Sequence, residues 1–256
     1  MCGICGAVAL DGPLQLPDGL PERMIGSLRH RGPDEFGAWR DRSAFLGHAR
    51  LSIIDLASGQ QPLTTVSGRH WLVFNGEIFN YPELTAELEA LGHRFRTRSD
   101  TEVIVRAYQE WGAACVERFN GQFAFAIWDR IDRRLFLARD RFGIRPLYLA
   151  RHGDVLLFGS EIKSLLAWPG VDRSLAPDRL AVEGGIQHPH LDGRLPGRPQ
   201  LVPAVGIVED DGPALQPGQD AEEHPAVKGL ASVRLPEFPI HRTFSSVFPG
   251  CGTKGT

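Results

Sequence analysis

The first ten residues constrain the fold of this chain more than any other stretch. Cys2 follows the initiator Met1, and a small apolar run from Ile4 to Leu10 comes almost directly after it. Such a run predicts a buried strand, which would hold the N-terminus in a core instead of leaving it frayed. If Met1 is removed, Cys2 carries a thiol and an α-amine with a pKa of roughly 8, so the amine can relay the thiol proton. We therefore predict an N-terminal nucleophile with its own base, against the plainer interpretation of a start codon followed by a buried Cys.

Cys5 lies three residues after Cys2, a spacing that also occurs in metal sites and redox pairs. The four Cys of the chain stand at positions 2, 5, 115 and 251, so no second closely spaced pair completes a zinc site. On a strand, residues three apart point to opposite faces of the sheet, which disfavours a redox pair. We therefore interpret the Cys residues as thiols and predict no metal ligands.

Composition divides the chain near residue 180. Residues 1–180 hold 22 Lys and Arg against 22 Asp and Glu, whereas residues 181–256 hold 6 against 9. The second segment also contains ten of the nineteen Pro and no Trp or Tyr. A segment so poor in large apolar side chains has little to offset the entropy of ordering. We predict one domain over residues 1–180 and a Pro- and Gly-rich, mostly irregular tail over residues 181–256.

Neither region has the concentration of Lys and Arg that is typical of nucleic-acid-binding proteins. No run approaches the roughly 20 apolar residues that a membrane span requires, and the first residues lack the basic and apolar regions of a signal peptide. We therefore expect a globular, cytoplasmic protein with neither nucleic acid nor membrane as a partner.

Hydrophobic periodicity places helices in the middle of residues 1–180 and strands at both ends. Helices are expected over residues 21–28, 82–91 and from residue 100 onward, the last one opened by the capping-box pattern of Ser99 to Glu102. Strands are expected over residues 4–10, 44–48, 71–74, 123–128, 135–138, 147–150 and 155–158. The strand before Asn75-Gly76 is expected to turn there with positive φ. Because helices and strands do not alternate, antiparallel sheets with helices on their outer faces are favoured, an α+β fold.

Nine short motifs occur between residue 1 and about residue 180. They are MCGICG at 1–6, RHRGPD at 29–34, GHARLSIIDL at 47–56, QPL at 61–63, FNGEIFNY at 74–81, SDTEVI at 99–104, FAFAIWD at 123–129, LARDRFGIRPLY at 137–148 and SEIKSLL at 160–166. In order and spacing they resemble the class II glutamine amidotransferases, which are N-terminal-nucleophile hydrolases, and in particular asparagine synthase (glutamine-hydrolysing). The resemblance implies a four-layer α/β/β/α sandwich of antiparallel sheets, in agreement with the element order.

The resemblance also implies a set of catalytic residues. Cys2 would attack the side-chain amide of glutamine, form a thioester and release ammonia, with its α-amine as the proton relay. Asn75 and Gly76 would form the oxyanion hole from a side-chain amide and a backbone N–H. Taken alone, Asn75-Gly76 is equally typical of a hairpin turn. We interpret His48 as a hydrogen-bonded core side chain and not as a base.

The other implied residues would bind the two charged ends of glutamine. Arg50 would clamp the α-carboxylate with its planar guanidinium, and Glu77 and Asp100 would bind the α-ammonium. Each has a plainer interpretation, Arg50 as a surface residue and Asp100 as a charge at a helix N-terminus. Backbone contacts along the same groove would come from Leu51, Ser52, Ile53 and Ile54.

Two classes of function are open at this point. In the first, the chain is an enzyme, or part of one, that hydrolyses glutamine to glutamate and ammonia. In the second, it is a non-catalytic, partner-binding remnant that keeps the fold. A narrower alternative within the first class is an amidotransferase that supplies ammonia to another acceptor, but Gly32-Pro33-Asp34 and Leu51-Ser52-Ile53 favour the asparagine synthase type.

In the family, this domain is fused to an ammonia-accepting synthetase domain that uses ATP and Mg to convert aspartate to asparagine. The glycine-rich S-G-G-x-D-S loop of that domain does not occur in this chain. We therefore expect no cofactor for the glutaminase half. The implied partners are L-glutamine and the synthetase domain, and the resemblance also allows a homodimer.

Overall fold

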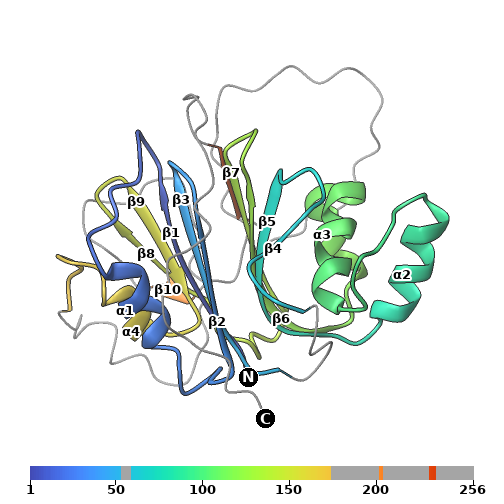
Figure 1. The fold of residues 1–256 in the computed structure, drawn as a ribbon, viewed down its shortest axis with the longest axis horizontal. Coiled ribbons are helices and arrows are strands. Elements are labelled where there is room, and N and C mark those ends of the chain that lie inside the picture. The colour runs from blue at the N-terminus through green and yellow to red at the C-terminus, as the bar shows by residue number, and fades with distance from the viewer. Residues whose placement is uncertain (53–58, 174–201, 204–230, 235–256) are drawn as a thin grey trace, which may run out of the picture.

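The structure is a computed structural model that describes residues 1–52, 59–173, 202–203 and 231–234. Two β-sheets face each other in its centre, and helices lie on the outer face of each (Figure 1). All the strand pairs among these residues are antiparallel. The fold is therefore the α/β/β/α sandwich that the sequence predicts.

The first sheet has six strands in the order β10-β8-β9-β1-β3-β2. Their bounds are Gly3–Ala9 for β1, Glu35–Arg40 for β2, Ala44–Arg50 for β3, Tyr148–His152 for β8, Val155–Gly159 for β9 and Val202–Pro203 for β10. The N-terminal strand β1 is an interior strand, because it pairs with β3 on one side and with β9 on the other. The residues that follow Cys2 are thus fixed in a sheet, as the apolar run predicts.

The second sheet has five strands in the order β11-β7-β6-β5-β4. Their bounds are Leu63–Thr64 for β4, His70–Ile78 for β5, Gly121–Asp129 for β6, Arg134–Arg139 for β7 and Ala231–Arg234 for β11. Strands β5 and β6 pair over their whole length, from His70 opposite Asp129 to Ile78 opposite Gly121. The pairing of β5 with β6 therefore runs from one end of each strand to the other.

Two pairs of helices form the outer layers. Helices α1 (Leu20–Gly26) and α4 (Ile162–Leu165) cover the first sheet, and α2 (Tyr81–Ala90) and α3 (Asp100–Trp111) lie on the side of the second (Figure 1). A 3-10 helix, Gly112–Arg118, follows α3. Helix α3 begins where the sequence predicts, with Ser99 Oγ accepting a hydrogen bond from the Thr101 N–H at 3.1 Å.

Apolar side chains fill all three spaces between the four layers. Along β1 the side chains alternate, so that Ile4 and Val8 lie in the cluster between the sheets. Cys5 and Ala7 point the other way and lie in the cluster beneath α1 and α4. A third cluster lies between the second sheet and α2 and α3. Since both faces of each sheet are buried, interior strands such as β1 and β6 are apolar along their length instead of alternating.

The expected turn at Asn75-Gly76 is absent, and this prediction was wrong. Strand β5 continues through both residues to Ile78, because pairing with β6 overrides the local turn signal. Gly76 nevertheless has a φ of 152°, and a Cβ there would lie 2.1 Å from the carbonyl oxygen of Gln122 on β6. The position therefore requires glycine because of a close backbone approach.

Two short stretches of the predicted tail extend the sheets. Strand β10 pairs with β8, and strand β11 pairs with β7, so these stretches are regular where the sequence predicts irregular chain. The other residues after 173 lie outside the described residues, and the domain boundary at residue 180 stays a prediction. Residues Ile53 and Ile54 of the predicted site also lie outside the described residues.

Candidate active site

Cys2 lies directly before β1, at the end of the sandwich where the N-terminus emerges beneath the two sheets (Figure 1). Its Sγ accepts a hydrogen bond from the Leu51 N–H at 3.4 Å and lies 3.6 Å from the Leu51 carbonyl oxygen. A cleft opens beside it. The residues that line this cleft include Cys2, Arg50, Leu51, Gln61, Asn75, Gly76, Glu77, Asp100 and Arg145. The fold thus brings together residues from β3, β5, α3 and the loop before β8 that are up to 143 positions from Cys2.

Burial raises the pKa of the Cys2 thiol. The amide of Leu51, the positive N-terminus and Arg50 act in the opposite direction but do not outweigh the burial, and Asp100 adds to the increase. The thiol therefore stays protonated near neutral pH until a base takes its proton. Cys5 is fully buried on the opposite face of β1, which excludes a redox pair with Cys2 in this arrangement.

His48 is not that base. Its side chain is 1% exposed, and Nε2 lies 3.1 Å from the carbonyl oxygen of Phe74. Burial lowers the pKa of His48 to about 3, although the bond to Phe74 acts in the opposite direction. The interpretation of His48 as a core side chain is confirmed.

Asn75 lies in the middle of β5 and lines the cleft with Cys2. The residue is 1% exposed, and neither Oδ1 nor Nδ2 has a hydrogen-bond partner among the residues that the structure describes. Burying an unpaired amide costs about 1–3 kcal/mol, so such groups are rare unless a ligand completes them. Gly76 follows with a φ that glycine adopts readily, and it lines the same cleft.

Asp100 is the first residue of α3, and its Oδ2 accepts a hydrogen bond from the Ile78 N–H at 3.1 Å. Burial raises the pKa of this carboxyl, the bonds from Ile78, Thr101 and Ser99 counteract the increase, and nearby Glu77 adds to it. Glu77 and Asp100 both line the cleft, so the fold places two carboxyl groups there.

Arg50 ends β3, where it is 4% exposed and not the surface residue of the plainer interpretation. Its Nη1 donates to Glu35 Oε2 on β2 at 2.8 Å, and the two residues are opposite each other in the sheet. The guanidinium is thus fixed by an acidic neighbour while it lines the cleft. A fixed planar fork suits a carboxylate better than a flexible ammonium does.

The segment after Arg50 is held by the loop that ends in Asp34. The Asp34 N–H donates to the Arg50 carbonyl oxygen at 3.1 Å, and the Ser52 N–H donates to Asp34 Oδ2 at 2.8 Å. This pair of bonds fixes Leu51, whose amide meets Cys2 Sγ. Ser52 does not line the cleft itself, and the structure describes neither Ile53 nor Ile54.

Sequence reasoning missed a clamp on the backbone of Cys2. Arg31 Nε donates to the Cys2 carbonyl oxygen at 2.9 Å, and Arg31 Nη1 donates to Glu161 Oε1 at 3.1 Å. Next to Glu161, Ser160 makes two hydrogen bonds with Ile4: its Oγ accepts from the Ile4 N–H at 3.0 Å, and its own N–H donates to the Ile4 carbonyl oxygen at 2.8 Å. The N-terminal strand is therefore fixed on both sides of Gly3. The motifs RHRGPD and SEIK carried these residues, but nothing in the sequence pairs them.

Gln61 and Arg145 also line the cleft without having been predicted. Gln61 Oε1 accepts a hydrogen bond from the Phe74 N–H at 2.6 Å, directly before Asn75. The Arg145 side chain contacts the Met1 sulfur. Both residues stand in the motifs QPL and LARDRFGIRPLY, so the signal was present, but their role depends on contacts between distant segments.

Residues 1–185 match the family model of the glutamine amidotransferase domain. This chain belongs to that family. The amidotransferase domain is 42% identical over 173 residues to asparagine synthetase (glutamine-hydrolysing) 3 of Bacillus subtilis, an alignment that covers 67% of this chain and 28% of that protein. It is also 42% identical over 181 residues to a putative asparagine synthetase (glutamine-hydrolysing) of Mycobacterium tuberculosis strain H37Rv, with 65% and 28% covered. The chain thus spans about 28% of the length of these curated relatives.

Among solved structures, glutamine phosphoribosylpyrophosphate amidotransferase from Bacillus subtilis, complexed with ADP and GMP, resembles the amidotransferase domain. The TM-score is 0.54 at 22% identity, and the match covers 65% of this chain and 43% of that one. At this identity the similarity concerns the fold. It confirms the sandwich of the N-terminal-nucleophile hydrolase type.

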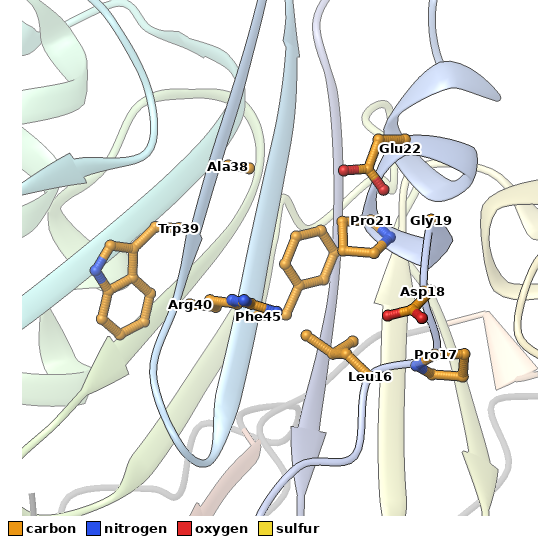
Figure 2. A pocket seen from close by; sticks show the side chains of 10 residues that line it. All are labelled: Leu16, Pro17, Asp18, Gly19, Pro21, Glu22, Ala38, Trp39, Arg40 and Phe45. Carbon is orange, nitrogen blue, oxygen red and sulfur yellow. The ribbon is translucent and has the colours of Figure 1, made fainter. Parts of the chain in front are cut away.

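A larger cavity of the amidotransferase domain, about 200 Å³, lies away from Cys2. Figure 2 shows it between the chain before α1 and the helix-facing side of β2 and β3, with Phe45 on its wall and Trp39 on the other side of the strand. Its lining includes Leu16, Asp18, Glu22, Ala38, Arg40 and Phe45. None of the predicted site residues is among them, so size alone does not identify the active site.

Within residues 1–52 and 59–173 the amidotransferase domain has no group of three or more His, Cys, Asp or Glu side chains placed to hold a metal ion. None of the helices that the structure describes is long and apolar enough to cross a membrane.

Proposed function

We propose that this amidotransferase domain hydrolyses L-glutamine to L-glutamate and ammonia through a thioester on Cys2. One observation carries the proposal: the buried side-chain amide of Asn75 has no hydrogen-bond partner among the described residues and lines the same cleft as the Cys2 thiol. An unpaired donor beside a nucleophile is what the negative oxygen of a tetrahedral intermediate requires. The names of the relatives, which are glutamine-hydrolysing, support the same substrate.

The reaction follows from the positions of these groups after Met1 is removed. The α-amine of Cys2 takes the thiol proton, and Sγ attacks the amide carbon of glutamine. Asn75 Nδ2 and the Gly76 N–H donate to the oxygen that becomes negative. The intermediate collapses, the carbon–nitrogen bond breaks, and the leaving nitrogen takes the proton from the α-ammonium to depart as ammonia. Water then hydrolyses the thioester, with the amine as base, and glutamate leaves.

The charged ends of glutamine would be bound by fixed groups of opposite sign. Arg50, held by Glu35, would donate to the α-carboxylate. Asp100, together with Glu77, would accept from the α-ammonium. Leu51 would contribute backbone groups, and the same role for Ile53 and Ile54 stays a prediction. Ser52 does not line the cleft and would act only by holding Leu51 through its bond to Asp34.

The product ammonia would pass to an acceptor half. By the names of its relatives, we propose that the whole protein makes asparagine from aspartate with ATP and Mg in a fused synthetase domain. An ammonia acceptor other than aspartate is the alternative, because a relative with a different name, amidase chry2 of Gibberella zeae, is 38% identical to this chain over 180 residues. A homodimer is a further expectation, which analytical ultracentrifugation of the purified chain tests.

The test is ammonia release from glutamine by the chain whose intact mass shows that Met1 is removed. We expect activity from the processed chain and none from Cys2→Ala or from a chain that keeps an N-terminal tag, since each lacks the thiol or the free amine. Asn120→Ala, at an exposed Asn outside the cleft, serves as a control that keeps activity. Equal activity from the tagged chain contradicts the mechanism, and an inactive processed chain favours the non-catalytic alternative.

A further inference from the structure

Two arginines line the cleft, and they differ in whether a carboxylate lies beside them. Arg50 is paired with Glu35 at 2.8 Å. Arg145 is 8% exposed and makes no ion pair with any carboxylate that the structure describes. Within the part of the chain that the structure describes, its Nε is buried without a hydrogen-bond partner, and its Nη1 contacts only the sulfur of Met1, a weak acceptor. A buried guanidinium without an anion is costly, so the position calls for an anionic ligand.

The backbone that carries Arg145 is built firmly. Asp140 is 2% exposed and accepts hydrogen bonds from the Ile144 N–H and the Arg145 N–H, each at 2.9 Å. Asp140 is itself fixed to β6, because its N–H donates to the Phe123 carbonyl oxygen at 2.8 Å and its side chain accepts from the Phe123 N–H at 3.3 Å. The loop is therefore anchored in the sheet, and it directs one cation into the cleft at a fixed place.

Met1 occupies the space next to this cation only until the chain is processed. Once Met1 is removed, Arg145 loses that contact while Cys2, Asn75 and Asp100 still share the cleft with it. Of the groups of glutamine, the amide faces Asn75 and the ammonium faces Asp100 in the proposed function. The α-carboxylate is the remaining group, and it alone is an anion.

Resting on that proposed function, we propose that Arg145 is a substrate-binding residue that donates to the α-carboxylate of glutamine alongside Arg50. The carboxylate then lies between a guanidinium already neutralised by Glu35 and one that has no other anion. Arg145 thus sets the selectivity for a free amino acid over a peptide-bound or amidated glutamine, because only the free acid offers the missing charge.

The experiment compares two substrates on the processed full chain, L-glutamine and L-glutamine α-amide, in which a carboxamide replaces the α-carboxylate. Arg145→Gln is expected to lower kcat/KM for glutamine about tenfold to a hundredfold, mostly through KM, as the loss of a charge-assisted hydrogen bond implies. The α-amide, a poorer substrate from the start, should lose nothing further. Arg145→Lys should recover part of the affinity, and Arg141→Gln, an exposed arginine of the same loop, should match the wild type.

Arg145→Met fills a similar volume without the charge, and it replaces Arg145→Gln if that variant does not fold. Equal losses on both substrates would show that Arg145 only maintains the structure, and an unchanged KM for glutamine would show that it does not bind the carboxylate. Either result overturns the inference while leaving glutamine hydrolysis intact. A wild-type chain that releases no ammonia from glutamine would instead contradict the proposed function.

Discussion

Two buried polar side chains on neighbouring strands of the second sheet differ in the number of hydrogen bonds that they make. Asp129, on β6 at the end of the ladder with His70, is 3% exposed, and its two oxygens accept from Arg69, His70 and the N–H groups of Ile131 and Asp132. Asn75, farther along β5, is 1% exposed and has no bond at all among the described residues. The second sheet thus provides Asp129 with hydrogen-bond partners from the protein, whereas the Asn75 amide stays available to a ligand.

The largest effect that we expect is the loss of catalysis when the Asn75 amide is removed. Asn75→Ala should lower kcat by about 100- to 1000-fold, because it removes a donor to the oxyanion. The free energy of unfolding should change by less than about 1 kcal/mol, since no bond is lost and an unpaired amide is removed. Steady-state ammonia release and urea unfolding measure the two quantities. A large loss of stability with unchanged kcat would make Asn75 a structural residue.

At Asp129 we expect the reverse, a large effect on stability and none on catalysis. Asp129→Asn should destabilise the fold by about 2 kcal/mol at pH 7, because the buried ring of His70 and the 39% exposed Arg69 lose charge-assisted hydrogen bonds, while activity per folded molecule stays unchanged. Asp132→Asn is the matched control: that carboxylate is 45% exposed and accepts one bond from Arg69, so it should cost less than about 1 kcal/mol.

Acid titration sharpens the role of Asp129. Burial alone would raise the pKa of this carboxyl, but the bonds from His70 and Arg69 outweigh burial and hold the pKa well below its usual range. The stability that it contributes is therefore present above the unfolded pKa of about 3.9 and is lost as the pH falls through the folded value. The wild type should lose its advantage over Asp129→Asn in thermal unfolding below about pH 4. An advantage that stays constant down to pH 2 would contradict this assignment.

Asp100 should show a smaller effect with the opposite sign. Burial raises its pKa, so its contribution to stability is greatest below the unfolded pKa and is lost as the pH rises through the folded one. At pH 7 Asp100→Asn should therefore stabilise the fold slightly while it raises KM for glutamine, as expected of a site that sacrifices stability for binding. Glu102→Gln, in the same helical turn, is the control. Burial would raise the pKa of Glu102, but the Thr97 and Arg96 amides and Arg106 outweigh it, so this change should destabilise.

The sequence predicts the elements that rest on local signals. Ser99 as the start of α3 and the buried strand after Cys2 were both correct, because capping and apolar runs act within a few residues. The turn at Asn75-Gly76 was wrong, because a ladder with β6, nearly fifty residues away, overrides the local preference. For the same reason the clamp of Arg31 and Glu161 on Cys2 was missed, since its partners are 130 residues apart in the chain.

The smallest expected effect comes from removing the chain after Pro177. Among the described residues, all those that contact Cys2 or line its cleft lie before that point, and the last member of the clamp is Glu161. The removed chain contributes β10, which pairs with β8 through two residues, and β11, which pairs with β7 through four, so the loss uncovers two sheet edges without opening the described core. Activity should be unchanged and the thermal midpoint only slightly lower, with more association between copies through the bare edges. Differential scanning calorimetry and light scattering of the shortened chain measure both. A shortened chain that does not fold would show that the residues after 177 belong to the domain and that the boundary predicted from composition is wrong.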